Sequence, residues 1–354
     1  METVTIILFL IFFSINTISS RHINGNQRKV IIDVDGGADD AWAIFILLQN
    51  EEKYNVKVEG IICSHGNAEK VDDVVKNIIR ILVAIKRLDI PVFMGASERF
   101  ILPPPSREQS EYFFGYDGFS DVKFKEAYTQ TIQVQEKHGV IFLNEILQKY
   151  PKEISLIFVG PLTTLALVVK LNPAVVGNVK DLYIMGGNRH GVGNTQNAAE
   201  FNFFIDPEAA NIVFYSFRQK PIYIVPWETI LTLGERLTYD YRFKTLTQVK
   251  DNKALEILNQ VEEIAFKNIK HWQPCDAYAV VTFLNYSIAT KVEKYHGRVE
   301  LNGLFTRGQL VLDHHDGKGN VAVIDDFDTE MFKENLFFRN CIQNYFFKHF
   351  SIEI

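Results

Sequence analysis

One short stretch near the N-terminus restricts the folds open to this chain. An apolar run at residues 30–32 leads into four aspartates, Asp33, Asp35, Asp39 and Asp40, and two glycines separate them into pairs. A helical pattern follows directly. The stretch therefore predicts a buried strand, a tight turn and a helix, a unit typical of α/β proteins.

The spacing of these aspartates also points to chemistry. Like charges packed this closely cost free energy unless a cation lies among them. All-oxygen ligands suit a hard cation such as Ca²⁺ or Mg²⁺. The stretch predicts a metal-centred active site at the C-terminal end of a strand, and a solvated turn is the alternative interpretation.

Strand-like runs alternate with helical patterns along the rest of the chain. We predict strands at residues 58–63, 90–94, 154–159, 182–185 and 222–225, and helices at residues 69–86, 162–170 and 207–217. This alternation favours an α/β fold with a mostly parallel, Rossmann-like sheet and helices on both faces. We find no repeat and no low-complexity linker, so we expect a single mature domain at residues 21–354.

Other segments depart from this alternation. Residues 98–135 are long and irregular, and residues 227–275 are polar at first and then helical over 253–270. Long irregular stretches in compact domains are often functional loops, so either segment is a candidate lid, with surface elaboration as the alternative. Residues 308–326 predict short strands, and residues 327–347 predict a final helix rich in Phe.

Composition excludes several classes of protein. The chain has 354 residues, of which 47% are hydrophobic and 23% charged, as in a globular protein. The net charge is −6 and no basic run is present, which argues against nucleic-acid binding. Three cysteines, Cys63, Cys275 and Cys341, are too few for a disulfide scaffold.

The first twenty residues are typical of a targeting segment. An unbroken apolar run at residues 6–13 precedes small and polar residues, as in a secretory signal peptide cleaved near Ser19 or Ser20. The run is too short for a comfortable transmembrane helix. We expect residues 1–20 to be removed and the mature protein to be secreted, without membrane attachment; an uncleaved anchor is the alternative.

Two more polar clusters accompany the opening aspartates. One contains Glu200–Phe201–Asn202 and the other is Cys275–Asp276–Ala277. With Gly66–Asn67 and Gly160–Pro161–Leu162–Thr163, these motifs resemble the inosine–uridine-type nucleoside hydrolase family over nearly the whole mature chain. The resemblance implies the nucleoside hydrolase fold and Ca²⁺-dependent hydrolysis of the N-glycosidic bond of ribonucleosides to free base and ribose.

The resemblance also implies a set of metal ligands. Asp35, Asp40 and Asp276 would bind Ca²⁺ through their side chains, and Val159 would bind it through its main-chain carbonyl. Asp35 would also act as general base towards a metal-bound water. Asp33 would hold the loop or another ligand in place from behind.

Five further residues resemble the ribose-hydroxyl ligands of the family: Asp39, Asn67, Asn194, Glu200 and Asn202. A mixture of carboxylates and amides suits a vicinal diol, because each hydroxyl both donates and accepts a hydrogen bond. A site built in this way rejects 2′-deoxynucleosides. Taken singly, Asn194 also fits a turn residue and Glu200 an ordinary loop residue.

The base subsite departs from the inosine–uridine pattern. A family histidine before the late aspartate is replaced by Cys275, and another before a loop glycine is replaced by Phe114. Purine-preferring relatives stack the base between aromatic rings, so we expect purine nucleosides such as inosine. Phe114, Tyr116, Trp227 and Trp272 are the stacking candidates, and a core position is the alternative for each.

Other functional classes remain open on the sequence. The missing histidines are compatible with a secreted nucleoside-binding protein that has little or no turnover. A phosphohydrolase of the haloacid dehalogenase type also opens on Asp-x-Asp after a strand, but it leaves Glu200, Asn202 and Asp276 unexplained. The family resemblance implies a small-molecule nucleoside substrate and a homo-oligomer, either a dimer or a tetramer.

Overall fold

The computed structural model of the chain describes residues 26–101, 112–124, 134–249, 251–315 and 318–336. The predicted signal peptide lies outside these residues, as do Cys341 and the second half of the predicted final helix. Among the helices in the described ranges, none has the length and apolar character needed to cross a bilayer.

In the part of the chain that the structure describes, nine strands form one sheet in the order β3-β2-β1-β4-β5-β6-β9-β7-β8. All pairs from β3 to β9 are parallel, and β7 is antiparallel to both β9 and β8. The mostly parallel α/β sheet predicted from the sequence is therefore confirmed. The strands are β1 (Arg28–Val34), β2 (Val56–Cys63), β3 (Val92–Met94), β4 (Ile154–Phe158), β5 (Leu182–Met185), β6 (Ile222–Val225), β7 (Ala289–Val299), β8 (Leu310–Asp313) and β9 (Val321–Phe327).

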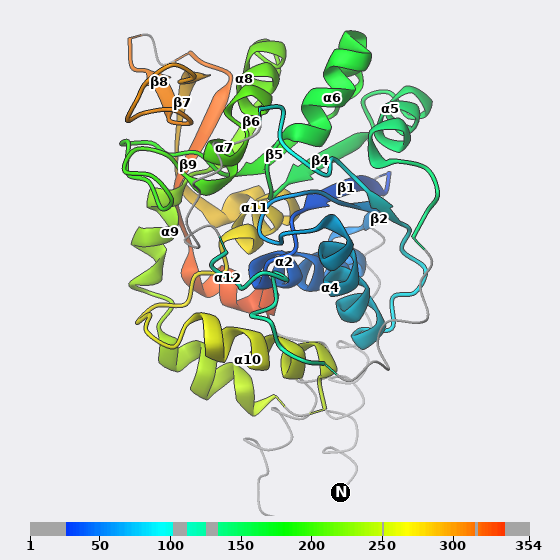
Figure 1. The fold of residues 1–354 in the computed structure, drawn as a ribbon, viewed down its shortest axis with the longest axis vertical. Helices are drawn as coiled ribbons and strands as arrows, with labels where there is room; N and C mark the ends of the chain where they lie inside the picture. The colour runs from blue at the N-terminus through cyan, green and yellow to red at the C-terminus, as the bar shows by residue number, and fades with distance from the viewer. Residues whose placement is uncertain (1–25, 102–111, 125–133, 250, 316–317, 337–354) are drawn as a thin grey trace, which may run out of the picture.

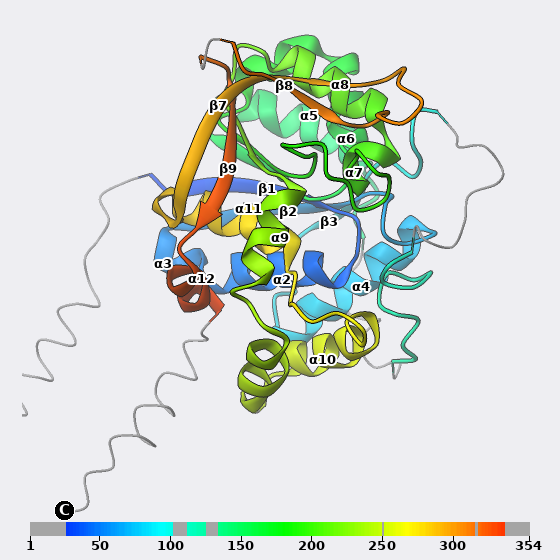
Figure 2. The ribbon, with the colours of Figure 1, turned by 90° about the vertical axis from the view of Figure 1, so that its left-hand side faces the viewer.

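Helices cover both faces of the sheet and create a hydrophobic core on each (Figures 1 and 2). One core includes α2 (Ala38–Gln49), α4 (Val71–Ala84), α9 (Trp227–Gly234), α10 (Lys253–Ala265), α11 (Cys275–Leu284) and α12 (Thr329–Leu336). The other includes α5 (Gly139–Lys149), α6 (Thr163–Leu171) and α8 (Pro207–Ser216). Two short helices, α3 (Glu51–Tyr54) and α7 (Phe201–Ile205), complete these layers. Helix α10 packs against α2 and α4 on the side away from the sheet.

The central strands are apolar because both of their faces are covered. All residues of β4 and β5 are buried, as are the last five of β1. Such continuous apolar runs are typical of parallel strands between two helical layers. Strand β7 is different, because most of its residues are exposed or half-buried and many are charged; the sequence did not reveal it.

The order of the strands creates a topological switch point in the sheet. Strand β1 pairs with β2 on one side and with β4 on the other, so the chain reverses its direction of travel across the sheet at β1. Open α/β sheets bind ligands at the carboxyl ends of strands beside such a switch point. Asp35 and Val159 directly follow β1 and β4 and therefore lie there.

One predicted segment needs correction. Helix α9 occupies residues that we expected to be polar, and α10 ends at Ala265 instead of continuing to residue 270. The short strands predicted within residues 308–326 are confirmed as β8 and β9, which β7 separates in the sheet. The described parts of residues 98–135 contain neither helix nor strand, as expected.

Candidate active site

Asp35 is fully buried, and Asn67 orients its carboxylate. Asn67 donates two hydrogen bonds to its carboxylate, from Nδ2 to Oδ1 at 2.8 Å and from the backbone N–H to Oδ2 at 3.0 Å. Glycines make room for this arrangement: a Cβ at Gly66 would lie 1.9 Å from Oδ2 of Asp35, and one at Gly160 would lie 2.8 Å from its Cβ. Burial raises the pKa of Asp35 to about 7.

Asp40 closes the turn between β1 and α2. Its carboxylate accepts the backbone N–H groups of Asp35 at 2.9 Å and of Gly37 at 2.7 Å. The turn requires a glycine at position 36, where φ is +88°. A Cβ added there would lie only 2.9 Å from Val74. The carboxylate thus lies at the N-terminus of α2, where the helix dipole favours negative charge.

Three carboxylates converge beside this turn. Oxygens of Asp39, Asp40 and Asp276 all lie within 4.8 Å of one another. Asp39 and Asp40 come from the first turn of α2, and Asp276 comes from the first turn of α11, which packs against α2. Burial raises the pKa values of these three groups well above their usual range, and repulsion adds to it: from Asp40 on Asp39, from Asp35 on Asp40 and from Asp39 on Asp276.

The convergence fits a hard cation. Oδ1 of Asp39 is buried and receives no hydrogen bond from any residue that the structure describes. A cation would satisfy that atom and remove the repulsion between the acids. The structure groups Asp39, which we expected on the ribose, with Asp40 and Asp276. Asp35, which we expected among the metal ligands, is adjacent and bonded to Asp40 through its own N–H.

Asp33 lies at the end of β1, behind the turn. It is fully buried, and the Ser64 hydroxyl donates to its Oδ2 at 2.8 Å. Burial raises its pKa well above the usual range. This placement agrees with the expected supporting role.

The carbonyl of Val159 lies at the end of β4 and accepts a hydrogen bond from Nδ2 of Asn202 at 2.9 Å. The same amide donates to the carbonyl of Met185 at 3.1 Å, at the end of β5. Asn202 therefore joins two strand ends, which the sequence analysis did not foresee. A carbonyl oxygen has two lone pairs, so Val159 keeps one for another partner.

Glu200 caps α7 and is almost fully buried. Its Oε1 accepts the N–H of Asn202 at 2.9 Å, and its Oε2 accepts the N–H of Gly187 at 2.8 Å. Burial nevertheless raises the pKa of Glu200 to about 7. Asn194 caps the same turn from outside, because its Oδ1 accepts the N–H of Phe201 at 2.8 Å.

Two of the aromatic candidates border this region. A Cβ at Gly37 would lie 2.9 Å from the ring of Phe114 and 2.9 Å from Nδ2 of Asn67, so the Phe114 ring lies against the turn. Trp227 is half-buried at the start of α9, and its backbone N–H donates to the carbonyl of Gly187 at 3.0 Å. The Tyr116 side chain is 47% exposed.

Trp272 does not fit the predicted stacking role. Its ring is buried, with 1% of its surface exposed, and it packs edge-on against Trp42 with 5.1 Å between ring centroids. Both indole N–H groups donate to Oε1 of Glu262, which forms a buried ion pair with Arg242 at 2.6 Å. Trp272 is a core residue that joins α10 to α2, which corrects the prediction.

Cys275 lies beside Asp39 at the start of α11. Its Sγ donates to the carbonyl of Gln273 at 3.4 Å. Burial and then the Asp39 carboxylate raise the pKa of the thiol well above its usual range. The thiol is therefore protonated, in agreement with a small packing side chain and not a nucleophile.

His65 is a polar residue of the site that the sequence analysis did not single out. Its Nε2 lies 2.8 Å from Oγ1 of Thr163, and that hydroxyl donates its only proton to Asp206 at 2.7 Å. Nε2 of His65 must therefore carry the hydrogen in this contact. Burial lowers the pKa of His65 to about 4, so the ring is neutral and fixes the segment before Asn67.

Comparison with known proteins decides the family. A model described as "Inosine-uridine preferring nucleoside hydrolase" matches residues 30–334. The chain belongs to this family. Its members are enzymes that hydrolyse ribonucleosides at the N-glycosidic bond, so the resemblance drawn from the motifs is confirmed.

Individual relatives agree with this assignment. The pyrimidine-specific ribonucleoside hydrolase RihA of Salmonella arizonae is 30% identical over 87% of this chain and 96% of its own length. A solved inosine-guanosine nucleoside hydrolase has a TM-score of 0.78 at 28% identity, over 88% of this chain and 97% of its own. A purine-preferring ribonucleoside hydrolase from Gardnerella vaginalis, with a TM-score of 0.74 at 24% identity, shares the fold. The named base specificities of these relatives differ from one another.

Proposed function

We propose that this chain is a Ca²⁺-dependent nucleoside hydrolase that favours purine ribonucleosides such as inosine. We also propose that it acts outside the cell after removal of residues 1–20. The observation that carries the catalytic proposal is the convergence of Asp39, Asp40 and Asp276 beside the buried Asp35 at the switch point of the sheet.

The acidic cluster would hold the cation. Asp39, Asp40 and Asp276 offer carboxylate oxygens, and Asp35 and the Val159 carbonyl lie at the adjoining strand ends. Oxygen ligands of this kind suit Ca²⁺, which takes six to eight of them. When bound, the ion would make a water more acidic and would orient sugar hydroxyls.

Asp35 would accept the proton of the attacking water. Both of its oxygens are oriented by Asn67, so the carboxylate has one fixed position instead of several rotamers. Positioned general bases contribute about 10²–10⁴-fold to a rate. Asn67 donates one hydrogen bond to each oxygen, and a carboxylate has about four lone-pair sites, so acceptor sites remain for the water.

The ribose would lie between the acidic cluster and α7. Breaking the glycosidic bond creates positive charge on the sugar, which nearby carboxylates stabilise. Asn194, Glu200 and Asn202 surround the N-terminus of α7 and are our candidates for the ribose hydroxyls. Asn202 uses Nδ2 on two carbonyls, so its Oδ1 is the atom available to a hydroxyl.

The base would lie near Phe114 and Trp227, which border the site from two different segments. Cys275 replaces a family histidine beside Asp276, and a thiol with a raised pKa is a poor acid for a leaving base. A purine is the better substrate for such a site, because it can take a proton more directly. The same observation favours a second candidate, a nucleoside-binding protein with little turnover.

Base release from inosine, guanosine, adenosine, uridine and 2′-deoxyinosine tests the proposal, with Ca²⁺ and with EGTA. We expect Ca²⁺-dependent release of hypoxanthine from inosine and no release from 2′-deoxyinosine. Full activity in excess EGTA would exclude the metal-dependent mechanism. Inosine binding by calorimetry without any base release would instead support the binding protein. Recovery of a mature chain that begins near residue 21 from culture medium tests secretion.

A further inference from the structure

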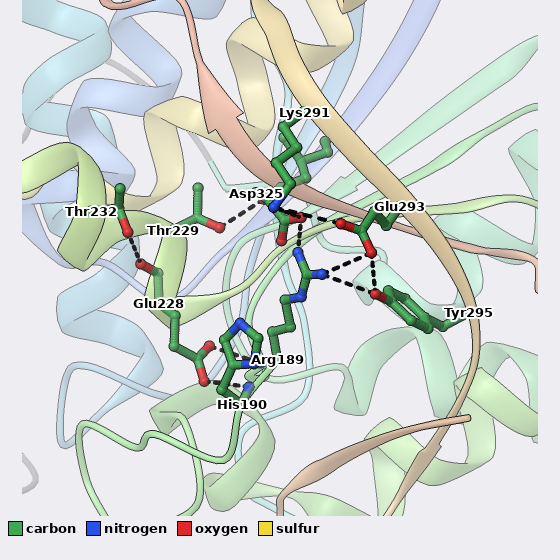
Figure 3. A network of polar contacts seen from close by, with 10 residues as sticks. Arg189, His190, Glu228, Thr229, Thr232, Lys291, Glu293, Tyr295 and Asp325 are labelled. Atoms are coloured by element: carbon green, nitrogen blue, oxygen red, sulfur yellow. Dashed lines mark hydrogen bonds and ion pairs between the residues drawn. The ribbon is translucent and has the colours of Figure 1, made fainter. Parts of the chain in front are cut away.

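The loop between β5 and α7 is held from outside by a residue that no motif singled out. We call residues 186–200 the substrate loop, because they include Asn194 and Glu200. The carboxylate of Glu228 accepts backbone N–H groups from Arg189 at 2.7 Å, His190 at 2.8 Å and Val192 at 3.0 Å. Figure 3 shows Glu228 reaching the loop beside Arg189 and His190. Charge-assisted hydrogen bonds of this kind are about twice as strong as neutral ones.

Glu228 belongs to a well-anchored helix. It lies in the first turn of α9, one residue after Trp227, whose N–H donates to Gly187 of the substrate loop. The next residue, Thr229, donates from Oγ1 to the carbonyl of Ile324 in β9 at 2.7 Å. Consecutive residues of α9 therefore bind the substrate loop on one side and the sheet on the other.

Arg189 anchors the same loop in a second direction (Figure 3). Its guanidinium forms ion pairs with Asp325 of β9 and, at 2.9 Å, with Glu293 of β7, and it donates to the Tyr295 hydroxyl at 2.9 Å. The Arg189 and Asp325 side chains are only 10% and 9% exposed. Hydrogen bonds from Tyr295 and Arg189 lower the pKa of Glu293 to about 2, so it is charged at neutral pH.

The substrate loop is also closed on itself. The N–H of Gly187 donates to Glu200 at 2.8 Å, and Nδ2 of Asn188 donates to the carbonyl of Ala198 at 2.6 Å. Glu200 is thus bonded to Gly187, which lies only two positions before Arg189, the first residue that Glu228 contacts. A shift of the backbone at Arg189 would therefore move the groups that orient Glu200.

We propose that Glu228 is a positioning residue for the ribose subsite and that Arg189 is its second anchor. Glu228 touches no substrate in this proposal; it acts by fixing the substrate loop relative to α9. Because Trp227 is the adjacent residue, the same helix would set the distance between the base side and the ribose side of the site. The inference rests on the proposed function, in which Asn194 and Glu200 bind ribose hydroxyls.

Kinetics of Glu228→Ala and Glu228→Gln test this inference, with Glu235→Ala as the matched control. Glu235 is an exposed residue at the other end of α9. We expect Glu228→Ala to raise both the KM for inosine and the inhibition constant of D-ribose about tenfold, the effect of losing hydrogen bonds to a charged group. Both constants of Glu228→Gln should lie between those of the unmodified enzyme and those of Glu228→Ala, because the amide oxygen of glutamine can still accept a hydrogen bond from the loop.

These readouts separate positioning from stability. A merely structural role would lower the fraction of active enzyme, and hence the apparent kcat, without changing KM or the ribose inhibition constant. If the unmodified enzyme hydrolyses inosine but Glu228→Ala keeps both constants at the control values, the inference is overturned and the proposed function stands. If the unmodified protein hydrolyses no nucleoside, the proposed function fails and the inference fails with it.

Discussion

Asn67 binds both carboxylate oxygens of Asp35, one through its side chain and one through its backbone. The two residues come from different strand ends, β1 and β2, which are neighbours in the sheet. The backbone contact depends only on the fold, whereas the side-chain contact depends on the amide at position 67. The orientation of Asp35 is therefore fixed by the sheet itself as much as by a single side chain.

Asp35→Asn should lower kcat for inosine about 10²–10⁴-fold, because an amide cannot accept a proton from water. The melting temperature should change little, since the replacement keeps the shape and removes a charge from a repulsive cluster. Steady-state kinetics and thermal denaturation measure the two effects. Asp72→Asn, an exposed aspartate of α4, is the control. Near-normal turnover of Asp35→Asn would show that another group is the base.

Gly66→Ala should reduce kcat/KM about 100-fold. The new Cβ would lie 1.9 Å from Oδ2 of Asp35, so the carboxylate has to move, and a displacement of about 1 Å at a reacting group has this scale of effect. Gly177→Ala is the matched control, because a Cβ there meets no atom within 4 Å. Equal activities for the two variants would contradict the tight packing around Asp35.

Glu200 should make the metal-free protein less stable as the pH rises. Its pKa is about 7 in the folded protein against a usual 4.5, so the folded state binds more protons than the unfolded state between these values. Stability from this group is therefore greatest below about pH 4.5 and is lost as the pH rises to about 7. The difference corresponds to about 3 kcal/mol.

Comparison with Glu200→Gln isolates this contribution from that of the other acids. In EDTA, the stability of the unmodified protein relative to Glu200→Gln should be greater at pH 5 than at pH 8. Urea denaturation at the two pH values measures the change. A relative stability that increases with pH would mean that the folded protein lowers the pKa of Glu200.

Glu262→Ala should lower the free energy of unfolding by about 3–5 kcal/mol, because the charge of Arg242 would remain buried without its partner. The exposed pair Lys244–Asp240 provides the control, and Asp240→Ala should cost less than about 1 kcal/mol. Chemical denaturation measures both. Similar effects for the two variants would show that burial adds nothing to the importance of the Arg242–Glu262 pair.

Cys275→His should raise uridine hydrolysis relative to inosine hydrolysis about tenfold or more, because an imidazole beside Asp276 could protonate the leaving base. Cys275→Ala is the control for the change in side-chain volume. The ratio of kcat/KM values for the two nucleosides is the quantity to compare. An unchanged ratio would mean that base preference has another origin than this position.

The sequence predicted those elements that one residue pattern defines. Strands β5 and β6 have the predicted bounds, because buried apolar runs between turns have few other structures available. The aspartates and the Glu200–Asn202 motif were found because acids and amides at fixed spacing are unusual. Strand β7 was missed because its exposed Lys and Glu residues hide the apolar alternation.

Other features depend on contacts that no local pattern records. Trp272 has the residue type of a stacking platform, and only the packing of α10 on α2 shows that it is a core residue. Glu228 binds backbone N–H groups, which almost every residue carries, so nothing in the sequence of the substrate loop marks its partner. Residue type and spacing therefore indicate which residues are candidates for a site, but not the contacts that hold those residues in place.

The Arg242–Glu262 pair also limits how α10 can move relative to the active site. Glu262 of α10 binds the indole of Trp42 in α2, the helix whose first turn carries Asp39 and Asp40. Moving α10 alone, away from Arg242, would break a buried ion pair at a cost of about 3–5 kcal/mol, so only about one molecule in 10²–10⁴ would be in that state at any moment. A movement on this side of the site must therefore carry α10 and Arg242 together, as one rigid unit.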